Sequence, residues 1–402
     1  MKKSMRGIIC LLLVFVMAFP MAGCGKSSEG KTLTERAEEL NKENSTVSSP
    51  FASSPTTVVA GESAVASGTP ISPATSGSVA SEPAIESRTI PEGKTRSLLT
   101  GKLIDDKYEN IRPYAFMFNN IQYAYPQTGT GRAGIIYEIL AEGGITRLMG
   151  IFDNMKGNRI GSARSARHYY VDFANEFDAI YIHYGQTKYA TAEINRLGMD
   201  ELSGLAAEGP TVFYRDYNIP APHNAFASAT GIYKATKNKS IRKKLRKGVK
   251  EHFNFDYENE VTNDMEGSKA AQKVTIPFSN YMTPYFTYSK KSGTYKRYAF
   301  GSVHKDLGSG KALTFTNLFI QYVNEYNKDH NGYQTMDLIN ESGKGYYITK
   351  GRAVKVYWKK GDAKSPTRFY YDKDFTDEAR VNPGKTYYAV FPKNRSDLIK
   401  IE

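Results

Sequence analysis

The order of apolar and polar positions divides the chain into three stretches. Residues 8–20 are almost wholly apolar, whereas residues 45–86 are rich in Ser, Thr, Ala and Pro and contain one aromatic residue. The rest alternates apolar runs with polar turns. A stretch like the second cannot bury enough apolar surface to offset the entropy of ordering it. The pattern therefore predicts a folded part that begins near residue 97.

Strands alternate with helices in the first half of the predicted folded part. The expected strands are residues 114–118, 148–152 and 179–184, and the expected helices are residues 165–177 and 187–197. Gly198 supplies a C-terminal stop for the second helix. Alternation of this kind indicates an α/β layer.

Residues 135–153 fit either of two elements. Their first apolar positions suit one face of a helix, and the whole stretch also suits two strands joined at Gly143 and Gly144. A pair of glycines between apolar runs favours the hairpin.

The second half of the folded part is expected to be rich in strands. Short runs of tyrosine and phenylalanine are separated by glycines or polar turns, and residues 313–326 form an apolar helix or a long strand. The tyrosines suit either an ordinary β core or a surface that stacks on sugars. We therefore predict an α+β fold, with an α/β layered domain at residues 97–230 and a β-rich domain at residues 267–402.

A basic helical connector is expected between the two domains, at residues 231–266. Nine of the residues 234–250 are Lys or Arg, and Ile241, Leu245, Val249 and Phe253 recur at every fourth position. This spacing predicts a basic amphipathic helix. Its apolar stripe either packs on the body of the protein or leaves a site for an anionic polymer or lipid surface.

The N-terminus carries an export signal. Cations at positions 2, 3 and 6 precede the apolar run, and Met21-Ala22-Gly23-Cys24 follows it. This order predicts a secretory signal at residues 1–23. Cys24 then looks like the acylated cysteine of a bacterial lipobox, which makes the lipid bilayer a partner. Cleavage removes Cys10, so the mature chain has no internal disulfide.

The export signal changes how the basic charge is interpreted. Loss of the three cations of the signal lowers the formal charge from +13 to +10. A basic protein is drawn to anionic partners, and outside the cell these are lipid head groups and wall polymers rather than nucleic acid. The predicted location is the outer face of the cytoplasmic membrane, where residues 24–96 form a tether of roughly 45–50 Å.

A cluster of arginines begins the first predicted helix. Arg164 and Arg167 lie one turn apart where a strand ends, and the N-terminus of a helix favours an anion. Ligands in open α/β sheets collect at the C-terminal ends of strands. Candidate ligand-binding residues are therefore Arg147, Arg164, Arg167, His183, Arg215, His223 and Asn224. The alternative is that the arginines pair with Glu142 or Asp172 in a structural network.

Signals for catalysis and cofactors are few. Glu142 and His183 are the candidates for an acid or base, and the histidines lack the spacing of metal ligands. No cofactor is expected. No nucleophile elbow is present, and carboxylates for glycoside cleavage could come from Glu138, Glu142 and Asp172. Whether the protein is an enzyme stays open at this point.

Five strings of residues resemble a known family. They are EGGITR at 142–147, GSARSAR at 161–167, APHN at 221–224, GKGYYITKGRA at 343–353 and NPGKT at 382–386. In these the chain resembles the YerB-like bacterial lipoproteins, a two-domain family of uncharacterised function. The resemblance implies architecture and an envelope location but no reaction. The leading hypothesis is a tethered protein that binds an anionic wall polymer or acts as a scaffold. The alternatives are an enzyme acting on wall glycans or their phosphate-linked precursors, and a partner of an envelope protein.

Overall fold

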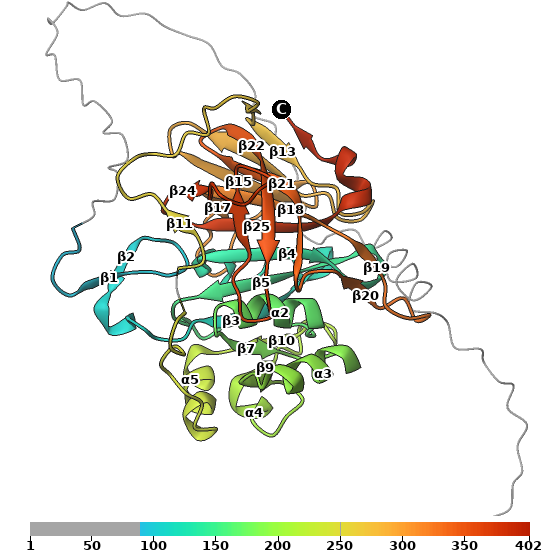
Figure 1. Cartoon of the computed structure of the whole chain (residues 1–402). Helices are drawn as coiled ribbons and strands as arrows, with labels where there is room; N and C mark the ends of the chain where they lie inside the picture. Colours follow the sequence, from blue (N-terminus) through green and yellow to red (C-terminus); the bar gives the residue numbers. More distant parts are fainter. Residues whose placement is uncertain (1–88, 250) are drawn as a thin grey trace, which may run out of the picture.

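A computed structural model describes residues 89–249 and 251–402. The predicted signal peptide, Cys24 and the tether up to residue 88 lie outside the described residues. The described part is built around one large mixed sheet that runs through both halves of the chain (Figure 1).

The large sheet has eleven strands. In spatial order they are β12 (Lys269–Ala270), β22 (Arg352–Lys360), β21 (Glu341–Thr349), β18 (Asn317–Val323), β25 (Thr386–Pro392), β4 (Ile135–Leu140), β5 (Thr146–Phe152), β3 (Tyr114–Asn120), β7 (Ile180–His183) and β8 (Glu201–Ser203), with β23 (Arg368–Tyr370) beside β22. The strand β25, from the end of the chain, pairs in parallel with both β4 and β18. The α/β and β-rich regions therefore share a single sheet.

Helices and a second sheet cover the two faces of the large sheet. The helices are α2 (His168–Glu176), α3 (Lys188–Leu197), α4 (Gly209–Val212) and α5 (Ala229–Asn238). The second sheet contains β13 (Lys273–Thr275), β14 (Tyr285–Ser289), β15 (Thr294–Ala299), β16 (Ser302–Val303), β17 (Thr314–Phe315) and β26 (Lys400–Ile401). Apolar side chains of α2 and α3 pack on one face, and those of α5 and the second sheet pack on the other.

Short elements complete the fold. Paired short strands are β1 (Lys94–Arg96) with β2 (Leu103–Asp105), β6 (Ile160–Gly161) with β10 (Ala225–Ala227) and β9 (Phe213–Arg215), β11 (Asn254–Phe255) with β24 (Arg380–Val381), and β19 (Glu325–Asn327) with β20 (Gln334–Met336). The 3-10 helices are η1 (Asp106–Tyr108), η2 (Gln122–Ala124), η3 (Thr130–Arg132), η4 (Glu142–Gly144) and η5 (Lys393–Leu398). Because β1 spans Lys94–Arg96, the last residues of the expected tether include a strand.

Several predicted elements are confirmed. Residues 135–153 form the hairpin of β4 and β5, with η4 as its turn. The helix expected at residues 187–197 is α3, where the Thr187 side chain accepts from the Ala190 N–H and Gly198 ends the helix in the left-handed conformation. The apolar stretch 313–326 is extended rather than helical, mainly as β18. The α+β fold is as predicted.

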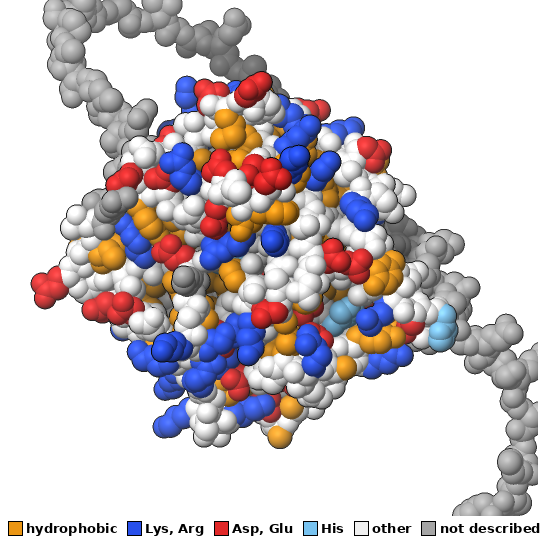
Figure 2. All heavy atoms as spheres, in the orientation of Figure 1, with side chains coloured by type: hydrophobic (Ala, Val, Ile, Leu, Met, Phe, Trp, Pro, Cys, Tyr) orange, Lys and Arg blue, Asp and Glu red, His pale blue; other side chains and the backbone are white. Residues whose placement is uncertain are grey.

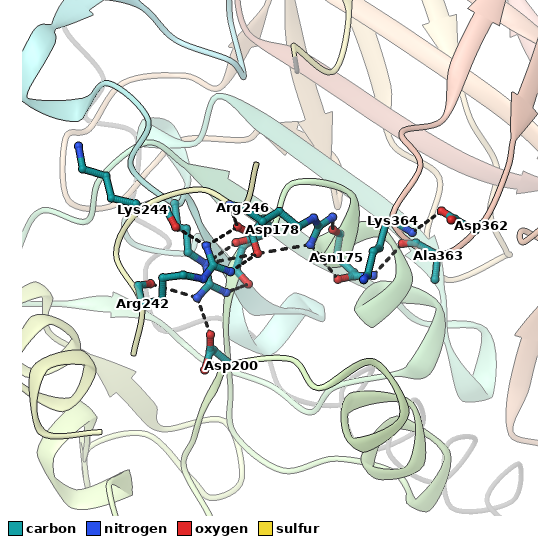
Figure 3. A network of polar contacts seen from close by, with 11 residues as sticks. Asn175, Asp178, Asp200, Arg242, Lys244, Arg246, Asp362, Ala363 and Lys364 are labelled. Atoms are coloured by element: carbon teal, nitrogen blue, oxygen red, sulfur yellow. Dashed lines mark hydrogen bonds and ion pairs between the residues drawn. The ribbon is translucent and has the colours of Figure 1, made fainter. Parts of the chain in front are cut away.

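The basic helix predicted across residues 234–250 is wrong beyond Asn238, where α5 ends. Figure 2 shows Lys and Arg side chains gathered over α5 and the segment that follows it. The guanidinium of Arg242 donates to both carboxylate oxygens of Asp178 at 2.8 Å, and the Arg246 N–H donates to the same carboxylate at 2.7 Å (Figure 3). Asp178, 64 and 68 residues earlier, thus holds this segment in an irregular conformation.

Another buried carboxylate, that of Glu138, connects the first half of the chain to the second. Glu138 is fully buried, and its Oε2 accepts from Arg297 at 2.6 Å and from the Tyr387 hydroxyl at 2.8 Å. Its Oε1 accepts from Asn120 and Thr146 at 3.0 and 2.7 Å. A buried carboxylate with this many partners fixes packing rather than reacting with substrate.

Candidate functional site

The predicted site residues lie at one edge of the large sheet. The strands β3, β4 and β7 run in the same direction, so their C-terminal ends meet at this edge. The segment that leads into α2 is tied to it, because the Arg164 N–H donates to the Met117 carbonyl at 3.0 Å and the Tyr184 N–H donates to the Arg164 carbonyl at 3.1 Å. The backbone of Arg164 is thereby fixed between β3 and the residue that follows β7.

Five of the predicted residues form one cluster, which we call the arginine site: Glu142, Arg147, Arg164, Arg167 and His223. The pKa of each is influenced by the charge of at least one other member of the cluster. The cluster contains three guanidinium groups and one carboxylate, which leaves the site with an excess of positive charge.

The pair of Arg167 and Glu142 forms a rigid wall of the site. Arg167 Nε lies 2.8 and 2.9 Å from the two carboxylate oxygens, and its Nη2 lies 2.5 Å from one of them. Although burial opposes the shift, the charge and hydrogen bonds of Arg167 lower the pKa of Glu142. Burial would lower the pKa of Arg167, but the charge of Glu142 outweighs burial and raises it. Both groups are therefore ionised at neutral pH.

The other two arginines lack such partners. Arg147 is 4% exposed, and its Nε and Nη1 are buried without any hydrogen-bond partner in the described part of the chain. Nε of Arg164 is in the same state. A buried donor without a partner costs about 1–3 kcal/mol, and more when the group is charged. The arrangement is therefore suited to an anion that accepts from both side chains.

The electrostatics of Arg147 and Arg164 also favour a bound anion. Burial, together with the charges of Arg167 and Arg164, lowers the pKa of Arg147 to about 9. Burial and the charge of Arg167 lower the pKa of Arg164 to about 10. Both side chains stay cationic at neutral pH, and a bound anion would relieve their mutual repulsion.

His223 contributes a neutral ring. Burial and the charges of Arg164 and Arg147 lower the pKa of His223 to about 4. Its Nδ1 lies 3.0 Å from Nδ2 of Asn119, and the half-exposed ring of Tyr123 lies 5.5 Å from the imidazole. Asn119 was not singled out from the sequence. The sequence marks it only as one of two polar residues at the end of the apolar run YAFMFNN. In the structure Asn119 pairs with Arg147 on the neighbouring strand.

The remaining predicted residues are engaged elsewhere. His183 is fully buried, with Nε2 2.6 Å from Glu201 and Nδ1 2.9 Å from the Gly185 carbonyl, which leaves neither nitrogen for a ligand or for proton transfer. Arg215 donates to Asn224 at 2.6 Å and to the Tyr184 hydroxyl at 3.0 Å. The expectation that His183 faces the same crevice as the arginines is therefore corrected.

The candidate carboxylates are also committed to partners. Glu142 is held by Arg167, and Glu138 by Arg297. Burial and the nearby Glu193 raise the pKa of Asp172 well above its ordinary value. Within the described residues, no group of three or more His, Cys, Asp or Glu side chains could hold a metal ion. Chemically, the site is suited to holding an anion.

Comparison with known proteins adds the family. Residues 99–242 match the model described as "Protein of unknown function (DUF3048) N-terminal domain", and residues 274–388 match its C-terminal domain. The chain is 31% identical over 305 residues to "Putative lipoprotein YerB" of Bacillus subtilis strain 168, covering 74% of this chain and 87% of the relative. The crystal structure of YerB from the same organism superimposes with a TM-score of 0.67 at 28% identity, covering 77% of this chain and 100% of that one. None of the helices described here is long and apolar enough to cross a membrane.

Proposed function

The chain belongs to the YerB-like DUF3048 family, and from this premise we propose that it is a lipoprotein of the cell envelope that binds an anionic group at the arginine site. The proposed anchor is acylated Cys24 on the outer face of the cytoplasmic membrane, and the proposed ligand is a phosphate or carboxylate of an envelope polymer. The lipobox-like sequence and the lipoprotein relative support the anchor.

One observation carries the proposal for the ligand. Arg147 is a buried cation whose Nε and Nη1 have no partner within residues 89–249 and 251–402. Proteins rarely bury a guanidinium without an acceptor, because desolvation is expensive. A phosphate or carboxylate matches the planar fork of an arginine and supplies the missing acceptors.

Binding of simple anions tests the ligand proposal. The protein without residues 1–24 retains every described element and can be titrated calorimetrically with inorganic phosphate and glycerol phosphate at low and high salt. We expect Arg164→Ala to weaken binding about 10- to 100-fold, because it removes one charge-assisted hydrogen bond of about 1.5–3 kcal/mol. The affinity of the unaltered protein should fall as the salt concentration rises.

Arg159→Ala is a matched control in the same stretch of chain. Arg159 pairs with Asp216 at 2.8 Å and stacks over Phe226, and its charge is not among those that shift the pKa of Arg164 or His223. Its loss should leave anion affinity unchanged. Unaltered affinity in a correctly folded Arg164→Ala protein would contradict the proposal.

The anchor is tested separately in cells. Cys24→Ser should abolish incorporation of a labelled fatty acid and release the protein from the membrane fraction. Retention of the label in Cys24→Ser would rule out Cys24 as the acylated residue.

A further inference from the structure

The arginine site shares its sheet edge with strands from the second half of the chain. Because β4, β25 and β18 are parallel, their C-terminal ends lie at the same edge. The register aligns Ile139 with Val390, and Val390 with Gln321. Lys393 follows the end of β25, and Asn324 follows the end of β18, at the same edge at which Glu142 follows β4.

A groove opens at this edge beside β18 and β21. It has a volume of about 570 Å³, and its lining includes Tyr322, Asn324, Asp337, Lys344, Lys393 and Ser396. Its walls are fixed: Asn324 donates to Asp337 at 2.7 Å, and the Trp358 indole donates to the Tyr322 carbonyl at 3.0 Å. The groove is thus shaped before any ligand arrives.

Polar groups in the groove are available for a ligand. The side chains of Lys344, Lys393 and Ser396 form no hydrogen bond or ion pair with any described residue. Asp337 is already occupied, because its carboxylate accepts from both Asn324 and the Tyr326 hydroxyl. Two cations without described partners, the carboxylate of Glu341, a hydroxyl and an aromatic side chain line the groove, which suits a ligand that carries many hydroxyl groups and a negative charge placed at the lysines.

The groove and the arginine site lie on neighbouring parts of the same sheet. Three strand steps separate β5, which carries Arg147, from β18, so at about 4.8 Å per step these two strands lie roughly 15 Å apart. Glu325 is linked electrostatically to residues near both sites. Its charge acts on Tyr169 beside the arginine site, and the charge of Arg395, on the same 3-10 helix as Lys393, acts on Glu325.

We propose that this edge of the sheet holds one extended polyanion built on a sugar or polyol backbone, with an anionic group at the arginine site and the next repeat units in the groove. The inference rests on the proposed anion binding and adds the class and length of the ligand. A chain of repeated charged units gains affinity when neighbouring units bind together, because the second contact is intramolecular.

Length dependence tests this inference. The protein without residues 1–24 is titrated with glycerol phosphate and with glycerol phosphate oligomers of increasing length. A parallel series uses wall glycan fragments that bear lactyl carboxylates. Affinity should rise with length and level off once the oligomer spans both sites, and the series that shows the rise identifies the anion.

Two double variants separate the groove from general charge effects. Lys344→Ala with Lys393→Ala should reduce oligomer affinity about tenfold and leave the affinity for the single unit unchanged. Lys290→Ala with Lys291→Ala removes the same charge from an exposed turn beside Lys350, at the opposite end of β21, and should change neither affinity.

The outcomes distinguish the two proposals. If glycerol phosphate and the single carboxylate unit both fail to bind, the proposed anion binding is wrong. If single units bind but neither series gains affinity with length, or if the groove variant keeps the gain, the extended ligand is ruled out and the arginine site stands alone.

Discussion

Two buried arginines in this protein differ in whether their guanidinium groups have hydrogen-bond partners. Arg112 is 3% exposed, donates from Nε to the Asp178 carbonyl at 2.7 Å, and pairs with Asp200 at 2.5 Å. Arg147 is equally buried, but its Nε and Nη1 lack partners among the described residues. The first arginine stabilises the fold. The second lowers stability in the absence of a ligand, a cost that is typical of binding sites.

We therefore expect Arg147→Met to stabilise the free protein. Replacing an unpaired buried guanidinium by an apolar side chain of similar length should raise the free energy of unfolding by about 1–3 kcal/mol. The same change should abolish the stabilisation that phosphate gives to the unaltered protein. Urea denaturation with and without phosphate measures both effects.

The matched control is Arg112→Met, which leaves Asp178 and Asp200 without this cation. It should lower the free energy of unfolding by about 3–5 kcal/mol. If Arg147→Met destabilises the protein to a similar degree, Arg147 is a structural residue and the ligand proposal loses its main support.

Glu325 should make anion binding depend on pH. Burial raises the pKa of Glu325 to about 7, and the charge of Arg395 only partly opposes this. Above pH 7 the side chain adds a negative charge near Tyr169 and the arginine site. Sulfate affinity should therefore fall by about threefold between pH 6 and pH 8. Sulfate keeps its charge over this range, and His223, with its pKa of about 4, stays neutral.

Glu325→Gln isolates this effect, since it removes the titrating group and leaves the arginines in place. Its sulfate affinity should be nearly independent of pH. The folded-state pKa lies above the ordinary value of 4.5, so the protonated form favours folding. This contribution to stability is complete below pH 4.5 and is lost as the pH rises through 7, which urea denaturation of both proteins can measure. A steep pH dependence of sulfate binding in Glu325→Gln would assign the effect to another group.

At the level of elements, structure that depends on neighbouring residues could be predicted from the sequence, and structure that depends on distant residues could not. The helix α3 could be located because Thr187 and Gly198 mark its ends within the sequence itself. The basic segment after α5 was misjudged because its apolar spacing fits a helix, whereas its conformation depends on Asp178. The same distinction applies to the site. The position of Arg164 at the start of a helix could be predicted, but the lack of partners for Arg147 could not.

The dependence of this segment on Asp178 leads to a prediction about stability. Asp178→Asn keeps the shape of the side chain and tolerates the left-handed backbone at this position. It leaves Arg112, Arg242 and Arg246 without their shared carboxylate, so we expect the free energy of unfolding to fall by about 3–5 kcal/mol. Trypsin should then cleave residues 239–249 in the folded protein.

Asp216→Asn is the matched control, because Asp216 pairs with a partly exposed arginine and lies outside this network. Its effect on the free energy of unfolding should be much smaller than that of Asp178→Asn. Equal effects of the two substitutions, or unchanged resistance to trypsin in Asp178→Asn, would contradict the role assigned to Asp178.

At the scale of the whole molecule, the two regions expected from the sequence are structurally interdependent. An α/β region and a β-rich region could be predicted, since each has its own apolar periodicity. The insertion of β25 beside β4 could not, because parallel pairing of strands about 250 residues apart leaves no local pattern. Glu138 depends on the same insertion, since Arg297 and Tyr387 come from the second region. Each hydrophobic core beside the large sheet thus contains side chains from both regions.

This shared sheet predicts that the protein unfolds in a single step. The only tryptophan, Trp358, lies in the second region, whereas the α-helices described here all lie in the first region and the start of the connector, before residue 239. Tryptophan fluorescence and far-ultraviolet circular dichroism therefore report on different regions. Because separation would expose the β4 edge and leave Glu138 buried without Arg297, we expect the two probes to give coincident urea transitions. Two separate transitions, or a fragment of residues 89–266 that folds with its own sharp transition, would show instead that the regions are independent domains.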